Sequence, residues 1–168
     1  MERGIKAKIK RYGRDILSSD TFKRALEQVH HYDNSVGRHS LQVAWETLRV
    51  CKVLRQLGIE VDERKAVRAA LLHDLGMIGR EMKYANNYET SRKHPVDSLA
   101  VARKLVPDLD ESMIQAIERH MFPIFAKPPT KAEAVAVCIA DKLASIKEVK
   151  EKAVARLGDF MDSHNRSK

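Results

Sequence analysis

The chain has 168 residues and carries 31 Lys and Arg against 23 Asp and Glu, which gives a formal net charge of +8. With 43% hydrophobic and 32% charged residues, it is typical of one globular domain rather than of a disordered chain. No stretch without a charged side chain exceeds seven residues, which excludes a membrane-spanning helix. The N-terminus also lacks the apolar segment of a secretory signal, so we expect a cytoplasmic protein.

Basic side chains concentrate at the two ends of the chain. Residues 2–14 carry six basic side chains and one acid, and residues 163–168 are also basic. We interpret both ends as solvated, although a positive charge also suits nucleic acid or a phosphorylated substrate. Cys51 and Cys138 lie within apolar helical patterns and have no Cys-x-x-Cys spacing. They therefore predict buried thiols in a reducing compartment.

The first half of the chain contains three predicted helices. The first covers residues 20–30, and the second begins at Asn34 or Ser35 and runs to about residue 57. Its apolar residues share one face at spacings of three, four and seven, and Gly58 ends it. The third starts at Asp62 and ends before Gly76.

The segment 76–93 has two glycines, an Asn-Asn pair and no clear period, which predicts a long loop. Pro95 suits the first position of a helix that reaches about residue 106, with His94 as its cap. Another helix is expected from Asp108 or Asp110 to about residue 120.

The last long helix is marked by Thr130 and Glu133, which form a Thr-x-x-Glu capping box. It should run to about residue 157, with Gly158 as its stop. No alternating strand pattern is present, and seven Gly with five Pro are few breakers for this length. The sequence therefore predicts an all-α, single-domain bundle of about six or seven helices, with a core over about 35–150 and peripheral ends over 1–19 and 159–168.

Several polar residues interrupt the apolar faces or stand at predicted helix ends. Each has an ordinary structural explanation: a satisfied core histidine, a helix cap, a histidine at a helix C-terminus, or a carboxylate in a salt bridge. Their number favours a common cause, which is metal binding. The candidate ligands are His39, His73, Asp74, His94, His120 and Asp141.

His73 and Asp74 are the most unusual pair, because they follow the apolar run 69–72 and precede Gly76. A buried carboxylate without a partner is costly, and a helix C-terminus disfavours a negative charge. A divalent cation would remove both costs. Imidazole together with carboxylate favours a transition metal such as Mn, Fe, Co, Ni or Zn over calcium.

With these candidate ligands in this order, the sequence resembles the HD-domain superfamily of metal-dependent phosphohydrolases. The string Leu-Leu-His-Asp-Leu-Gly over 71–76 and the string Ile-Ala-Asp-Lys over 139–142 are close to two family motifs, and the likeness covers about 35–148. It implies that His39, His73, Asp74 and Asp141 bind a first metal ion. His94 and His120 match the extra ligands of a two-metal branch, so one or two ions are expected, with Asp74 as bridging ligand and catalytic residue.

The sequence also departs from that family, because Met77 stands where many members have a lysine. Another cation should therefore bind the phosphate. The candidates lie beside the ligands or in the predicted loop, and nothing in the sequence chooses among them: Arg38, Lys83, Arg92, Lys93 and Lys142.

The resemblance implies a phosphohydrolase that cleaves a phosphoester or phosphoanhydride of a small nucleotide-like substrate with a metal-activated water. A symmetrical dinucleoside-tetraphosphate hydrolase is the alternative within enzymes; the Gly-Tyr-Pro signature of cyclic-dinucleotide phosphodiesterases is absent. A non-catalytic nucleotide- or nucleic-acid-binding module is the alternative from another class. Nucleic acid is not the expected partner, because aromatics are only 5% and do not alternate with the basic residues. The sequence does not decide whether the protein forms a homo-oligomer, because Trp45 suits either a core or an interface.

Overall fold

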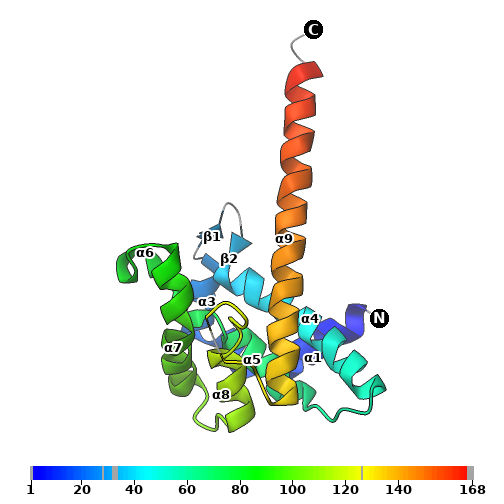
Figure 1. Cartoon of the computed structure of the whole chain (residues 1–168), viewed down its shortest axis with the longest axis vertical. Helices are drawn as coiled ribbons and strands as arrows, with labels where there is room; N and C mark the ends of the chain where they lie inside the picture. Colours follow the sequence, from blue (N-terminus) through cyan, green and yellow to red (C-terminus); the bar gives the residue numbers. More distant parts are fainter. Residues whose placement is uncertain (1, 28, 32–33, 126, 166–168) are drawn as a thin grey trace.

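The computed structural model describes residues 2–27, 29–31, 34–125 and 127–165 (Figure 1). The first half contains α1 (Glu2–Tyr12), α2 (Arg14–Ser18), α3 (Asp20–Glu27), α4 (Val36–Gln56) and α5 (Glu63–Leu72). The second half contains the 3-10 turn η1 (Leu75–Met77), α6 (Arg80–Lys83), α7 (Asn87–Leu105), α8 (Glu111–Glu118) and α9 (Ala132–Asn165). The predicted all-α fold is confirmed.

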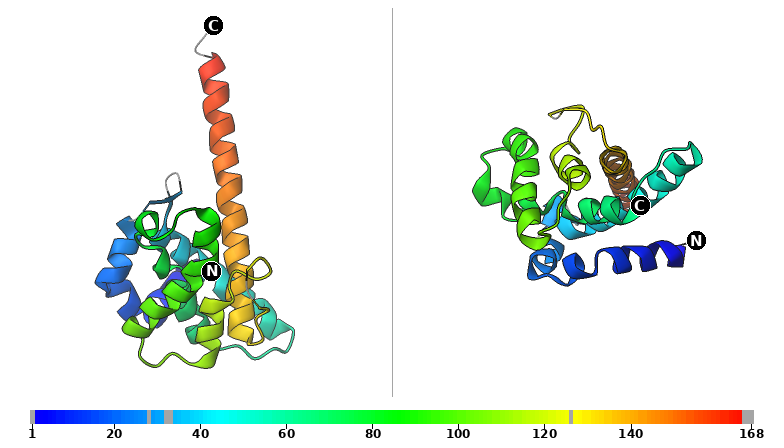
Figure 2. Two further views of the ribbon diagram at one scale, coloured as in Figure 1. Left: turned by 60° about the vertical axis from the view of Figure 1, so that its left-hand side comes forward. Right: turned by 90° about the horizontal axis from the view of Figure 1, so that it is seen from below.

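Helices α4, α5, α8 and α9 pack against one another and form the centre of the bundle. Their buried faces include Val43, Leu71, Ile117 and Val137, and α7 covers η1 at one side. The two further views show α9 rising from this body, with its C-terminal half clear of the other helices (Figure 2). Trp45 is partly buried against the core.

Side-chain caps at three predicted helix starts are present. Ser35 accepts a hydrogen bond from the Arg38 amide at the start of α4, Asp62 caps α5, and Asp110 caps α8. Each such cap contributes about 1 kcal/mol. The turn after α4 uses Gly58 at φ 78°, a left-handed conformation that favours glycine.

The prediction of a long loop over 76–93 is wrong. This segment holds η1, α6 and the first turns of α7, which starts at Asn87 with Asn86 as its cap. His94 therefore lies inside α7 rather than at its cap, and Pro95 is accommodated within the helix.

The predicted capping box and stop of the last helix are also wrong. Thr130 donates from its hydroxyl to Gln115, whereas Glu133 accepts a hydrogen bond from the Asp62 amide. α9 then starts at Ala132 and continues through Gly158 to Asn165. Both capping residues are used in tertiary contacts instead.

The N-terminal segment packs on the body rather than forming a free arm, but its basic side chains are solvated as predicted, since all six except Lys8 are exposed. α1 and α2 pack on the body with Ile9 and Ile16 buried, and Arg68 of α5 binds the Asp15 carboxylate through two hydrogen bonds of 2.6 and 2.7 Å. The backbone after α3 also forms a small unpredicted antiparallel pairing of β1 (Val29–His31) with β2 (Asn34–Ser35), directly before α4.

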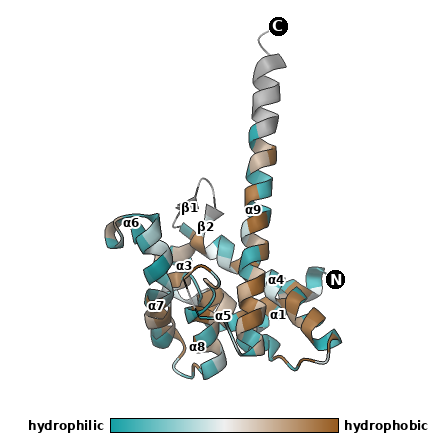
Figure 3. Ribbon diagram, in the orientation of Figure 1, coloured by the Kyte–Doolittle hydropathy of each residue, from teal (hydrophilic) through white to brown (hydrophobic). Residues whose placement is uncertain are grey.

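Polar and apolar residues alternate along the helices (Figure 3), which is typical of helices that bury one face and expose the other. Both cysteines are buried and unpaired, as predicted. Among the described residues, no helix combines the length and the apolar character needed to cross a bilayer.

Candidate metal centre

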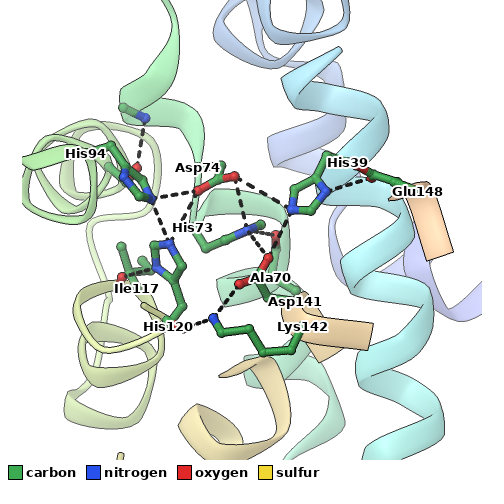
Figure 4. A network of polar contacts seen from close by, with 12 residues as sticks. His39, Ala70, His73, Asp74, His94, Ile117, His120, Asp141, Lys142 and Glu148 are labelled. Carbon is green, nitrogen blue, oxygen red and sulfur yellow. Dashed lines mark hydrogen bonds and ion pairs between the residues drawn. The ribbon is translucent and has the colours of Figure 1, made fainter. Parts of the chain in front are cut away.

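The six predicted ligands come from separate elements and meet at one buried point (Figure 4). His39 lies in the first turn of α4, while His73 and Asp74 lie between α5 and η1. His94 lies within α7, and His120 follows α8. The sixth, Asp141, lies on α9.

The Asp74 carboxylate is at the centre of the cluster. Its Oδ2 atom is 3.7 Å from the Nε2 atom of His39 and 3.4 Å from that of His73. Its Oδ1 atom is 3.2 Å from the Nε2 atom of His94 and 3.4 Å from that of His120. Each carboxylate oxygen therefore faces its own pair of imidazoles.

Asp141 adds a second carboxylate to one of these pairs. Its Oδ1 atom is 3.1 Å from His39 Nε2 and 3.8 Å from His73 Nε2, and its Oδ2 atom accepts a 2.8 Å hydrogen bond from Lys142. These contacts define a first set of candidate ligands, His39, His73, Asp74 and Asp141, which we call the first ligand set. The candidates Asp74, His94 and His120 form the second ligand set.

Backbone carbonyls fix three of the four rings. The Nδ1–H groups of His73, His94 and His120 donate to the carbonyls of Ala70, Thr90 and Ile117 at 2.8, 2.9 and 2.7 Å. A carbonyl can only accept, so Nδ1 carries the proton and Nε2 is left to face Asp74. This is the arrangement in which a histidine ligates a metal ion.

The residues present fit a metal ion. His39, His73 and Asp74 bring one donor atom each within 4.8 Å of one another, as do Asp74, His94 and His120. The Nε2 atom of His73 is buried and has no hydrogen-bond partner among the described residues. Such an atom is costly unless it binds something, and imidazole with carboxylate suits a divalent transition metal.

Electrostatics in the cluster favour added positive charge. Burial raises the pKa of Asp74, but electrostatic interaction with the neighbouring His73 and the hydrogen bond from His94 outweigh it and hold this pKa well below its usual value. Burial lowers the pKa of His39, but hydrogen bonds to Asp141 and Glu148 raise it to about 10. The proton that His39 thereby keeps is the charge that a bound cation would replace.

In the second ligand set, the pKa values of the two histidines shift in opposite directions. Burial lowers the pKa of His120 to about 3, so this ring is neutral. Burial also lowers the pKa of His94, but its hydrogen bond to Asp74 outweighs it and raises this pKa. The two Nε2 atoms are 2.8 Å apart, which lets a protonated His94 donate to a neutral His120.

Gly76 brings α7 close enough to supply His94. A Cβ atom at this position would lie 2.3 Å from the backbone nitrogen of Ser98 and 2.7 Å from the carbonyl oxygen of His94. The Gly76 amide also donates a 2.9 Å hydrogen bond to the Ser98 hydroxyl. The glycine after the His-Asp pair therefore sets the distance between η1 and α7.

A cavity of about 780 Å³ opens onto the cluster. Asp74, His94 and Asp141 are among the residues that line it, and α7 and α9 supply most of the other lining residues. Its volume lies in the range of small-molecule sites. The cations that line it are Arg80, Lys142, Lys152 and Arg156.

Of the five cations expected to bind phosphate, Lys142 alone is among the residues that line this cavity. Arg38 lines a neighbouring hollow, and Arg92 lines another near the end of α8. Lys83 donates to the Gly76 carbonyl at 3.0 Å, and Lys93 forms a salt bridge with Glu89.

Sequence reasoning missed Arg80, Lys152 and Arg156. A signal for two of them was available: Lys152 and Arg156 lie eleven and fifteen residues after Asp141, spacings that repeat the face of a helix. Arg80 fell within the segment predicted as a loop, where no helical face was defined.

Comparisons with known proteins agree with this geometry. A family model of the HD domain matches residues 36–146. Ribonuclease Y of Oleidesulfovibrio alaskensis is 33% identical over 135 residues, which cover 77% of this chain and 23% of that protein. Ribonuclease Y of Nitratidesulfovibrio vulgaris is 28% identical over 163 residues, which cover 88% of this chain and 29% of that protein.

The Ribonuclease Y of Ureaplasma parvum is 28% identical over 137 residues, which cover 82% of this chain and 24% of that protein. The chain thus spans about a quarter of the length of these curated relatives. No solved structure matches it significantly. The family model covers well over half of the chain, and the chain belongs to the HD-domain family.

Proposed function

We propose that this protein is a metal-dependent phosphohydrolase that cleaves a phosphoester or phosphoanhydride of a nucleotide-like substrate. The observation that carries the proposal is the Asp74 carboxylate, whose two oxygens each face a pair of imidazole Nε2 atoms. Two divalent ions, of Mn, Fe, Co, Ni or Zn, would be held by His39, His73, Asp74 and Asp141 and by Asp74, His94 and His120. When bound in such a pair, these ions lower the pKa of water and neutralise charge on a phosphate.

The chain's own groups have distinct tasks in this reaction. Asp74 would contribute one oxygen to each ion, and it would accept the proton that the attacking water loses. Lys142 donates to the Asp141 carboxylate at 2.8 Å and to the His120 carbonyl at 2.6 Å. An ammonium group has three protons, so Lys142 keeps a third donor for a substrate phosphate in the cavity.

Further cations extend the phosphate-binding surface of the cavity. Arg80 lies on the α6 side, while Lys152 and Arg156 lie on α9. Charge-assisted hydrogen bonds from such groups bind and orient phosphate oxygens. Together with Lys142, they supply the positive charge that the family lysine missing at Met77 would otherwise supply.

A second candidate function is cleavage of RNA, which the names of the Ribonuclease Y relatives favour. These names conflict with the sequence-based expectation that nucleic acid is not a partner. The cavity also supports it, because Lys152 lies eleven residues from Asp141, or about 16 Å along α9. A polynucleotide has further phosphates to place there, whereas a mononucleotide does not.

The experiment is a substrate panel with Mn²⁺: a single-stranded RNA, a dinucleoside tetraphosphate and nucleoside monophosphates. The products separate the candidates: shortened oligonucleotides, two nucleoside diphosphates, or a nucleoside with inorganic phosphate. Asp74→Ala should lose at least about 100-fold in rate on the preferred substrate, whereas Asp108→Ala, at an exposed position outside the cavity lining, should not. An Asp74→Ala protein that retains the parent rate would refute the assigned role.

A further inference from the structure

His39 differs from the other three histidines in what holds its ring. Its Nδ1–H group donates to a carboxylate, Glu148 Oε1, at 2.8 Å, where His73, His94 and His120 donate to backbone carbonyls. A carboxylate behind an imidazole makes the ring a stronger ligand than a neutral carbonyl does, because it stabilises positive charge on the ring. The two ligand sets are therefore not equivalent.

One helix supplies the groups on both sides of the His39 ring. Glu148 lies seven residues after Asp141 on α9, which is two turns along the same face. Asp141 contacts Nε2 at 3.1 Å while Glu148 accepts from Nδ1, so the imidazole is held between two carboxylates (Figure 4). The Glu148 side chain is 20% exposed, so the contact is largely screened from water.

The two ligand sets also differ in their negative charge. The first set has two carboxylates, Asp74 and Asp141, and a third, Glu148, directly behind it. The second set shares the Asp74 carboxylate and otherwise consists of His94 and His120. A divalent cation is attracted more strongly to the set with more negative charge.

We propose that Glu148 is a positioning residue that holds His39 with Nε2 toward the ion and makes the first ligand set the tighter of two metal sites. This inference rests on the proposed function, since it requires that the cluster bind metal. The consequence is an order of loading: the first set fills at low metal concentration, and the second fills afterwards.

The test is calorimetric titration of Mn²⁺ into the metal-stripped protein. The parent should show two classes of site, and Glu148→Ala should weaken the tighter class by 10- to 100-fold while the weaker class stays unchanged. In Glu148→Gln, the affinity of the tighter class should lie between that of the parent and that of Glu148→Ala. The amide oxygen still accepts a hydrogen bond from Nδ1–H of His39, but it carries no charge. Glu151→Gln is the matched control, since Glu151 lies three residues further along α9, is exposed and is not among the residues that line the cavity over the cluster.

A second readout follows the His39 ring itself. The hydrogen-bonded Nδ1 proton of His39 should give a downfield nuclear magnetic resonance signal that is kept in Glu148→Gln and lost in Glu148→Ala. Glutamine has nearly the same shape as glutamate, so Glu148→Gln still provides the Mn²⁺ titration if Glu148→Ala fails to fold. Parent-like Mn²⁺ affinity at both classes in folded Glu148 variants would overturn this inference alone, whereas a parent protein that binds no divalent ion would overturn the proposed function as well.

Discussion

Gly76→Ala tests how closely the metal cluster depends on backbone packing. The new Cβ would lie 2.3 Å from the Ser98 nitrogen, while ordinary contacts begin at 3.4 Å. The neighbouring atoms are backbone, so α7 must retreat by about 1 Å, a form of overpacking that costs about 1–3 kcal/mol in stability.

The same retreat moves His94, which supplies a ligand of the second set. Metal–ligand distances tolerate only about 0.2 Å. Gly76→Ala should therefore lower the free energy of unfolding in urea and remove the second metal ion, while the first set, which has no ligand on α7, keeps its own ion. The assays are denaturant unfolding and metal content after equilibration with Mn²⁺.

Gly4→Ala is the matched control. Gly4 lies in α1, where an added Cβ meets nothing within 4 Å. Alanine there should leave metal content unchanged and add up to about 1 kcal/mol of stability, because Ala is the better helix former. A Gly76→Ala protein with parent stability and parent metal content would refute the packing argument.

The remaining predictions concern the ligand sets and one helix cap. His120→Ala should bind one Mn²⁺ fewer by titration and keep the ion of the first set; loss of both ions would contradict two separate sets. At Asp110, burial opposes ionisation but the hydrogen bond from Lys65 outweighs it and holds the pKa at about 2. Since asparagine caps equally well, Asp110→Asn isolates this charge. The contribution of the ionised carboxyl, under about 1 kcal/mol for a partly exposed pair, should be complete above about pH 4 and vanish as pH falls through 2. A stability difference from Asp110→Asn that grows on acidification would refute this.

Local sequence signals predicted much of the fold. Ser35, Asp62 and Asp110 are caps because their side chains bond to amides two or three residues away, which a sequence pattern can identify. The failures involve distant partners. Thr130 and Glu133 match a local motif, but Gln115 and the Asp62 amide bind them instead.

The six candidate ligands were identifiable because polar residues on apolar faces need an explanation. Their division into two sets was implied only by the resemblance to the HD-domain family, because the polar pattern alone does not say which Asp74 oxygen each imidazole faces. Glu148 was missed as a partner of His39 because 109 residues separate them. Pro95 misled the prediction at His94, because proline suits the first turn of a helix, whereas here α7 begins eight residues earlier and continues through it.

The central claim is that Asp74 lies between two metal ions. A crystal structure of the protein equilibrated with Mn²⁺, with anomalous scattering recorded at the manganese edge, tests it most directly. Two anomalous peaks are expected, one beside each Asp74 oxygen. The first should contact Nε2 of His39 and His73, and the second should contact Nε2 of His94 and His120. An anomalous difference map with fewer than two peaks beside Asp74 would contradict this claim.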